Sequence, residues 1–576
     1  MLRTKNVLTY LFVFLLIYSC SKSDSNEPEP ENTPSLSIPK VTTAAISEIT
    51  ESTAISGGNV TDDGGATITE RGVCWSTSTE PTVSDNKTTN ATGIGVFSSS
   101  LEGLDANTAY FLRAYATNNE GTAYGNEISF TTLEPEPIAK VYEGDLVLTT
   151  QQEVDDFGAE GFTAISGSLK IKDSNVPSTI VNLNPLNTIS TISDSLIIEE
   201  NLILNELNGF IELKNVGADI SIIRNKALQS INTFEKLEEV GGDIIFFAEE
   251  AVYSISGFNN LLTIAGGLYL INNSQGAVSE LNAFNNLETI GTDLSINRIN
   301  GNLVGLNKLN SIGAKLTIQG LSTIEDFTFF ESLTNIGGRV NVTANPVLES
   351  FNGFEKLTGL NGLSLLLNNS LTSLNGLENI RSIYGNLVIT INRNLENLQG
   401  LEGLEKVLNG GVDINQNMSL TSLNGLNNLK TIDQGLEIWR NDSLENLTGL
   451  ESLNSTGFGE ACTICFGRIR IESNENLLNI DALENLTSNW YGNIKISYNE
   501  KLVNLDGLRN LVNIYRFPQD TRVNGAIIEN NSNLNDVCGL KNVYDNNSSR
   551  FYVEGFFNGT ENNPEGDARA MLNLCD

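Results

Sequence analysis

The chain of 576 residues contains no histidine. This absence excludes zinc sites with imidazole ligands, Ser-His-Asp triads and Cys-His dyads, because each of them requires that side chain. Basic residues are also scarce: 34 Lys and Arg stand against 70 Asp and Glu, which gives a formal net charge of −36. A chain this acidic binds nucleic acid poorly and is repelled by anionic membrane surfaces. We therefore predict no nucleic-acid partner.

Long hydrophobic runs are also lacking. The N-terminal run, Val7–Tyr18, has twelve residues and follows Arg3 and Lys5, a pattern typical of a signal peptide, here residues 1–19. Its end, Ile17–Cys20, resembles the processing box of bacterial lipoproteins, with Cys20 as the acylated residue. This resemblance implies export by the general pathway and lipid anchoring at the outer membrane or cell surface of a Gram-negative bacterium. An ordinary signal peptide with an incidental cysteine is the alternative.

Two segments separate this leader from the rest of the chain. Residues 20–39 are acidic and rich in proline, a composition that cannot bury a core, so we expect a disordered tether. Residues 40–133 carry short alternating segments between turn clusters, a pattern typical of strands. In Leu104–Ala116 a leucine precedes Tyr110 by six residues, which resembles the signature of fibronectin type III domains. The resemblance implies a β-sandwich, followed by a proline hinge at 134–139.

From Gly167 to Asn531 one pattern recurs with a period near 24 residues. A fixed period of this size predicts a stacked solenoid, in which each coil buries its apolar edge against its neighbours. Three short extended segments per coil, with Gly and Asn at the bends, predict a right-handed β-solenoid of triangular section. We call the second apolar residue of each Leu-x-Ile motif an anchor. The fifteen anchors are Ile171, Ile198, Ile222, Phe246, Leu270, Ile296, Ile318, Val342, Leu365, Ile389, Ile414, Ile438, Ile471, Ile496 and Ile528.

An asparagine stands three residues after the anchor in eleven of the fifteen coils. We expect this asparagine ladder to be buried and to hydrogen-bond the turn backbone of its own and the next coil, since water cannot reach those groups. Ligand binding by the row is the alternative. The row is interrupted at Glu249, Ile299 and Leu321. Its members are Asn201, Asn225, Asn273, Asn345, Asn368, Asn392, Asn417, Asn441, Asn474, Asn499 and Asn531.

The repeat reads G-x-L-x-I-x-x-N-x-x-L-x-x-L-x-G-L, which resembles the receptor L domain, a relative of leucine-rich repeats. The resemblance covers roughly residues 140–545 and implies this fold and a bias toward extracellular recognition of protein or glycan. We place the solenoid at 140–576, with an N-terminal cap at 140–166 and a C-terminal cap at 532–576. A possible capping box, Thr150–Glu153, predicts a short helix in the first cap.

The cysteines suit a secreted chain. We expect a disulfide between Cys538 and Cys575 to clamp the C-terminal cap, and Cys462 with Cys465 to staple an enlarged coil. A C-x-x-C pair also occurs in redox and zinc sites. Redox chemistry usually needs a thioredoxin-like βαβ context, which is absent, and zinc needs two further soft ligands. We therefore predict neither a metal nor a cofactor.

Two sets of outward-facing residues are candidate binding surfaces. The middle residue of Leu-x-Ile, and the residue after the Ile, should point away from the core. In coils two to five they form an apolar ladder, whose alternative explanation is cover by a loop or neighbouring domain: Ile197, Ile223, Ile245, Phe247, Tyr269 and Ile271. Asp413, Glu437 and Trp439 form the second set, which resembles a sugar-binding platform; a solvated face with an incidental Trp is the alternative.

This order of segments predicts a lipid-anchored, non-catalytic binding or adhesion protein for an extracellular protein or glycan. Parallel β-helices also include polysaccharide lyases and hydrolases, so an enzyme is the first alternative. An enzyme would need carboxylates, or Asp with Arg or Lys, gathered on one strand face. The outward charges instead scatter along the sequence, and only Asp413 and Glu437 form a pair: Lys170, Asp413, Glu437, Arg470 and Lys495. A structural role in a surface layer is the third possibility.

Overall fold

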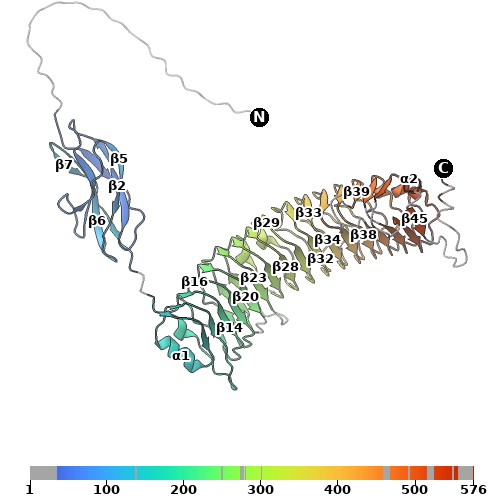
Figure 1. Cartoon of the computed structure of the whole chain (residues 1–576), viewed down its shortest axis with the longest axis horizontal. Helices are drawn as coiled ribbons and strands as arrows, with labels where there is room; N and C mark the ends of the chain where they lie inside the picture. The colour runs from blue at the N-terminus through green and yellow to red at the C-terminus, as the bar shows by residue number, and fades with distance from the viewer. Residues whose placement is uncertain are drawn as a thin grey trace, which may run out of the picture. The chain divides into compact units, whose positions relative to one another are not determined.

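The computed structural model describes residues 35–135, 139–247, 251–272, 278, 280–299, 301, 303–457, 468–490, 493–515, 524–547, 551–554, 572 and 575. The chain divides into two compact units, Met1–Ile138 and Ala139–Asp576 (Figure 1). The predicted leader with Cys20, the pair Cys462 and Cys465, and ladder residue Asn273 lie outside the described residues. Among the described helices, none is long and apolar enough to cross a membrane.

The first unit consists of antiparallel sheets. One contains β1 (Lys40–Thr43), β2 (Ala54–Asp62) and β5 (Gly95–Leu101). The other contains β4 (Asn86–Lys87), β3 (Glu70–Ser76), β6 (Ala109–Asn118), β7 (Gly121–Tyr124) and β8 (Ile128–Thr131).

Alternate strand residues form the core of this unit. Val60, Phe97 and Leu112 are buried there, and Trp75 packs in the same cluster. The Cys74 side chain is also buried, and burial raises the pKa of its thiol to about 11. The hydroxyl of Tyr110 accepts a hydrogen bond from the backbone N–H of Asp105 at 3.0 Å, which ties the start of β6 to the preceding turn.

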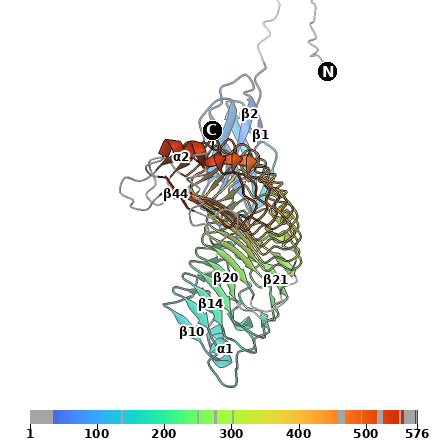
Figure 2. The same ribbon diagram turned by 90° about the vertical axis from the view of Figure 1, so that its right-hand side faces the viewer.

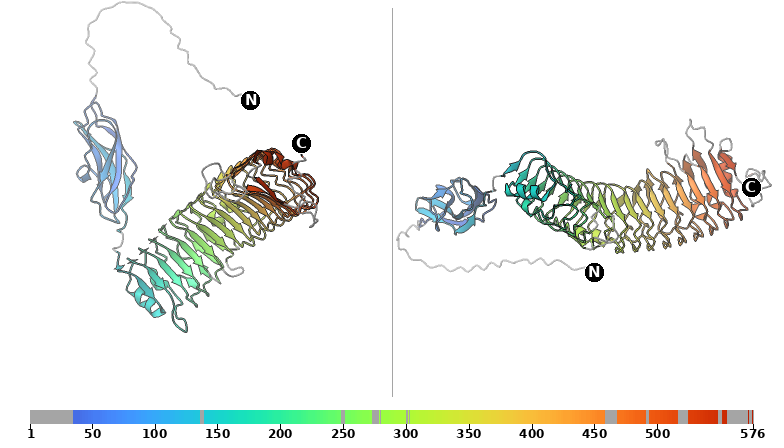
Figure 3. Two further views of the ribbon diagram at one scale, coloured as in Figure 1. Left: turned by 45° about the vertical axis from the view of Figure 1, so that its right-hand side comes forward. Right: turned by 90° about the horizontal axis from the view of Figure 1, so that it is seen from below.

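The second unit is a parallel β-solenoid of about 14 turns over residues 141–497, and its strands continue beyond this range. Its largest element, which we call the long sheet, has 17 strands and follows the whole solenoid (Figures 1 and 3). The strands are β10 (Leu146–Leu148), β12 (Leu169–Ile171), β14 (Leu196–Glu199), β17 (Ile220–Ile223), β20 (Ile244–Phe247), β23 (Leu268–Ile271), β26 (Leu294–Asn297), β28 (Leu316–Gln319), β30 (Val340–Thr343), β32 (Leu363–Leu366), β34 (Leu387–Thr390), β36 (Val412–Asn415), β38 (Leu436–Trp439), β40 (Ile469–Glu472), β42 (Ile494–Ser497), β44 (Asn524–Glu529) and β45 (Phe551–Glu554).

All fifteen anchors lie on strands of the long sheet and pair in register from Ile171 to Ile528. The prediction of a β-solenoid is therefore confirmed. This register follows from the sequence, because a slip by one residue would turn the aliphatic side chains from the core toward solvent.

The second side of each coil is a two- or three-residue strand. A nine-stranded sheet contains β9 (Val141–Tyr142), β11 (Ala164–Ile165), β13 (Thr191–Ile192), β16 (Asn215–Val216), β19 (Glu239–Val240), β22 (Thr263–Ile264), β25 (Thr289–Ile290), β27 (Ser311–Ile312) and β29 (Asn335–Ile336). A seven-stranded sheet contains β31 (Gly359–Leu360), β33 (Ser382–Tyr384), β35 (Lys406–Leu408), β37 (Thr431–Ile432), β39 (Ser455–Thr456), β41 (Ser488–Trp490) and β43 (Asn513–Tyr515).

The third side of the coil is β-strand in only some coils. This differs from our prediction of three β-segments in every coil. Four strands pair there: β15 (Glu206–Leu207), β18 (Ser230–Ile231), β21 (Ser254–Gly257) and β24 (Glu280–Ala283). Elsewhere this side contains turns and short 3₁₀ helices: η1 (Asn184–Leu186), η2 (Val304–Leu306), η3 (Thr328–Phe330), η4 (Asp481–Leu483), η5 (Asp506–Leu508) and η6 (Cys538–Leu540). Leucines spaced three residues apart on this side point inward from a tight turn, which needs no strand partner.

Aliphatic side chains from all three sides fill one continuous core. Stacked phenylalanines run through part of it: the ring centroids of Phe210, Phe234, Phe258 and Phe284 lie 6.3, 4.8 and 5.0 Å apart in turn. Both ends of the core need a cover, because a terminal coil has a neighbour on one side only.

Helices lie at the two ends of the solenoid (Figure 2). Helix α1 (Gln151–Ala159) begins with the predicted capping box between Thr150 and Glu153, and it buries Val154 and Phe157. Helix α2 (Lys541–Asn547) lies at the other end. Close by, Cys538 and Cys575 form a disulfide with a Cα–Cα distance of 5.5 Å.

The asparagine ladder is buried and connects successive coils. From Asn345 to Asn531 it is unbroken over eight coils. For example, Asn417 accepts the backbone N–H of Asn392 at 2.9 Å and donates to the carbonyl of Ile389, also at 2.9 Å. Each amide thus joins its own coil to the preceding one and satisfies two buried backbone groups.

The bend two residues after the anchor has a left-handed backbone, yet it is rarely glycine. Other bends of the coils are glycines with positive φ, as we expect: Gly353, Gly376, Gly400, Gly425 and Gly449. The residue there has a φ between 55° and 61° in eleven coils: Glu200, Arg224, Arg298, Ala344, Leu367, Ile391, Gln416, Arg440, Ser473, Tyr498 and Asn530. Only Gly320, with a φ of 68°, is a glycine at this position among the described coils. The ladder hydrogen bonds on either side of the bend hold this conformation in place.

Candidate functional site

A second row of side chains precedes the strands of the long sheet. We call the residues three positions before each anchor the pre-strand row. Where the row has Ser, Asp or Asn, a side-chain oxygen accepts the backbone N–H of the next coil. For example, Asp243 accepts from Gly267 at 2.6 Å, and Asn386 accepts from Gly411 at 2.9 Å. Our reading of the sequence missed this row, although Asp, Asn and Ser recur at the position.

Two consecutive coils have glycine in the row at Gly411 and Gly435, and a hollow lies there. A Cβ atom on Gly411 would come within 2.8 Å of the Gly435 carbonyl oxygen, and one on Gly435 within 2.7 Å of the Arg468 carbonyl oxygen. The close approach of neighbouring backbones therefore requires glycine at both positions. Because two adjacent coils lack a side chain at this position, the surface above the two glycines is open.

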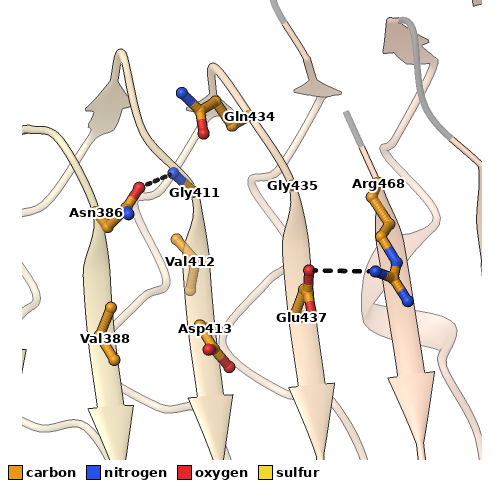
Figure 4. Close-up of a pocket in the computed structure, with 9 residues that line it drawn as sticks. All are labelled: Asn386, Val388, Gly411, Val412, Asp413, Gln434, Gly435, Glu437 and Arg468. Atoms are coloured by element: carbon orange, nitrogen blue, oxygen red, sulfur yellow. Dashed lines mark hydrogen bonds and ion pairs between the residues drawn. The ribbon is translucent and has the colours of Figure 1, made fainter. Parts of the chain in front are cut away.

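The hollow has a volume of about 380 Å³ and lies over the beginnings of β34, β36 and β38 (Figure 4). Its lining combines amides, carboxylates, a guanidinium and two valines: Asn386, Val388, Gly411, Val412, Asp413, Gln434, Gly435, Glu437 and Arg468. Two of our candidate residues, Asp413 and Glu437, are direct partners on adjacent strands. The structure thus places both carboxylates in one depression, between Asn386 and Arg468.

The charges on this part of the sheet are adjacent rather than scattered. Glu437 lies 3.9 Å from Arg468 and 3.4 Å from Arg470, measured between nitrogen and oxygen. Arg470 also pairs with Glu472 at 2.5 Å, and Glu472 with Lys495 at 3.3 Å. Burial alone would raise the pKa of Glu472, but the charges and hydrogen bonds of Arg470 and Lys495 hold it below its ordinary value. Residues far apart in sequence thus form one ion network.

Trp439 lies beside the hollow but is not an open platform. Its indole N–H donates to Asp413 at 3.2 Å, and Asp413 also accepts from the Asn415 side chain at 2.7 Å. The guanidinium carbon of Arg470 lies 4.9 Å from the ring centroid, and that of Arg440 lies 5.5 Å away. The half-buried ring therefore supports Asp413 and Arg470, while the groups of the hollow face solvent.

The six residues of the apolar ladder lie together on β14, β17, β20 and β23, with neighbouring strands in register. All six are half-buried. Burial, with help from the charges of Asp243 and Asp293, raises the pKa of Tyr269 above its ordinary value. Four strands, β26, β28, β30 and β32, separate this ladder from β34, where the hollow begins.

The described residues contain one group with metal-ligating side chains close together, Asp536 with Cys538 and Cys575. The two cysteines are joined in a disulfide, so neither sulfur is a thiolate ligand there.

No protein-family model matches this sequence, and no curated protein matches it. Among solved structures, the sensor domain of the anti-sigma factor RsgI4 from Pseudobacteroides cellulosolvens is similar over 18% of this chain and 100% of its own. The identity is 19% and the TM-score is 0.14, so this likeness carries no conclusion about fold or function.

Proposed function

We propose that the protein is a lipid-anchored surface protein whose solenoid binds an extracellular glycan or protein and catalyses no reaction. The hollow over Gly411 and Gly435 carries this proposal. It offers carboxylate, amide and guanidinium groups on a rigid sheet whose coils are joined by buried hydrogen bonds. Preorganised groups of this kind reduce the entropy lost when a ligand binds.

The remaining segments support display outside the cell. The leader and Cys20 would supply the lipid anchor, and residues 20–39 the tether. Residues 40–133 would be a fibronectin type III-like spacer, supported by the hydroxyl of Tyr110 that bonds the backbone five residues upstream. The solenoid itself would be a receptor L-domain-like module.

A polysaccharide-active enzyme is the second candidate, and the adjacency of Asp413 and Glu437 favours it. Neighbouring parallel strands lie about 4.8 Å apart, close to the separation of the two carboxyl groups in retaining glycosidases. Both carboxylates, however, already have protein partners: Asp413 accepts from Asn415 and Trp439, and Glu437 faces two arginines. These contacts favour a structural and binding role.

The test is glycan-array and pull-down screening of the full chain, followed by titration of whatever binds. Glu437→Gln and Arg468→Gln should each weaken binding about tenfold or more, because each removes a charged partner of the ligand. Glu212→Gln breaks the exposed pair with Lys236 elsewhere on the solenoid and should leave binding unchanged. No binding to either class of ligand by the folded protein would refute the proposal, and so would polysaccharide cleavage that Glu437→Gln abolishes.

A further inference from the structure

Between the apolar ladder and the hollow, the outward face of the long sheet carries no charge. Five consecutive strands, β26, β28, β30, β32 and β34, contribute two half-buried outward residues each. We call these ten residues the neutral strip. They are Ser295, Asn297, Thr317, Gln319, Asn341, Thr343, Ser364, Leu366, Val388 and Thr390.

The polar side chains of the strip are largely unused by the protein. In the part of the chain that the structure describes, six of them make no hydrogen bond with another protein group: Ser295, Thr317, Gln319, Asn341, Thr343 and Ser364. The side-chain oxygen of Asn297 is buried and also lacks a partner among the described residues. Elsewhere on this face, outward side chains form ion pairs with one another, for example Lys170 with Glu199 and Arg470 with Glu472. The strip thus presents ordered donors and acceptors that are free to bind a ligand.

These groups form two straight rows. Ser295, Thr317, Asn341, Ser364 and Val388 are successive partners, and so are Asn297, Gln319, Thr343, Leu366 and Thr390. Along each row the groups repeat about every 4.8 Å, and the rows lie about 6.6 Å apart, two residues along a strand. A ligand that contacts both rows over five strands must be extended and must repeat its own groups along the solenoid axis.

We propose that the neutral strip binds a long, uncharged polysaccharide that runs along the solenoid axis and reaches the hollow. This inference rests on the proposed function and names its class of ligand. An extended β-linked chain repeats its sugars at nearly the strand spacing, so hydroxyl groups meet Ser, Thr and Asn side chains strand after strand. Leu366 and Val388 offer apolar contacts for the C–H faces of the rings.

Two observations select this ligand. Val388 belongs both to the strip and to the lining of the hollow, so the two surfaces are continuous. The formal charge of −36 disfavours a polyanionic chain by long-range repulsion.

The experiment titrates the full chain with cello-oligosaccharides from disaccharide to octasaccharide, and with polygalacturonate as the acidic comparison. Affinity for the neutral series should rise with length until the strip is covered. The shape-conserving combination Thr317→Val, Asn341→Leu and Thr343→Val should weaken octasaccharide binding at least about tenfold. Thr317→Val alone should weaken it by a smaller factor, which keeps the test valid if the combined variant does not fold. Thr263→Val with Thr289→Val, on outward positions of the nine-stranded sheet, is the matched control and should change nothing.

Other outcomes separate the two proposals. If affinity is independent of length and is lost with Arg468→Gln but not with the strip variants, the strip is not the site while the proposed function stands. Stronger binding of polygalacturonate would also overturn the proposal that the ligand is an uncharged polysaccharide. It would indicate that Lys315 and Arg339, at the edge of the strip, bind an acidic chain. If the folded protein binds neither the neutral series nor any other glycan or protein, both proposals fail.

Discussion

Buried asparagines satisfy backbone hydrogen-bonding groups where the strands end, as inter-strand hydrogen bonds do within a sheet. Each ladder amide satisfies two backbone groups of the preceding coil, as Asn417 does for the carbonyl of Ile389 on β34 and for the N–H of Asn392 just after that strand. The residue before a ladder asparagine tolerates a left-handed backbone even when it is β-branched, as at Ile391 with a φ of 56°. Such a conformation costs about 1–2 kcal/mol outside glycine, so the surrounding bonds must outweigh it.

Asn417→Ala should therefore lower the free energy of unfolding by about 2–4 kcal/mol, because it leaves two buried backbone groups without partners. Chemical denaturation of the full chain measures this change. Asn424→Ala is the matched control in the same coil, since the described hydrogen bonds give that half-buried side chain no partner. It should stay within about 0.5 kcal/mol of the wild type. Equal effects of the two substitutions would contradict the structural role of the ladder.

Individual elements are short here and depend on what lies next to them. Helix α1 has nine residues, too few to be stable alone, and it is held by its capping box and by burial of Val154 and Phe157. The carboxylate of Glu153 accepts hydrogen bonds from the backbone N–H and the hydroxyl of Thr149, at 2.6 and 2.9 Å. These bonds lower the pKa of Glu153 below its ordinary value.

This lowered pKa predicts a pH-dependent cap. Because the folded pKa lies below the unfolded one, the stabilisation by Glu153 is complete above about pH 4.3 and is lost as pH falls through the lowered value. The melting temperature of Glu153→Gln should therefore lie below that of the wild type at neutral pH, and the difference should shrink as the pH falls through the lowered pKa of Glu153. Glu206→Gln, an exposed carboxylate on β15, should show no such convergence. A constant difference at every pH would refute the prediction.

The whole solenoid is a stack in which each coil contacts its neighbours and the ends need protection. The core is continuous from Leu148 to Leu572, yet its contacts are made coil by coil. In such an array, stability is transmitted mainly to nearest neighbours. The disulfide between Cys538 and Cys575 closes a separation of 37 residues at one end of the stack.

Replacing both of these cysteines by serine should destabilise the C-terminal coils by about 3–4 kcal/mol, from the entropy of the opened loop. Hydrogen exchange should accelerate at β42 and β44 and remain unchanged at β14, since coils far from the opened end keep their contacts. An equal acceleration in every coil would show instead that the solenoid unfolds as one cooperative unit.

Much of this architecture was predictable because it repeats. The Leu-x-Ile motif recurs fifteen times at intervals of 22 to 33 residues, so motif and spacing together place every anchor from Ile171 to Ile528 on its strand. The asparagine row was readable for the same reason. Single-coil features were not: Glu437 and Arg470 look scattered in sequence, but successive coils bring them within 3.4 Å.

Sequence periodicity alone thus specifies a β-solenoid with aliphatic side chains and amides directed inward, because only that arrangement buries both at a fixed interval. Stacking decides which outward groups meet. It brings Glu437 within 3.4 Å of Arg470, covers Trp439 with Arg470, and opens a hollow where two glycines come together. The physical reason is that contacts across coils join residues about 24 positions apart, and no local propensity carries information over that distance.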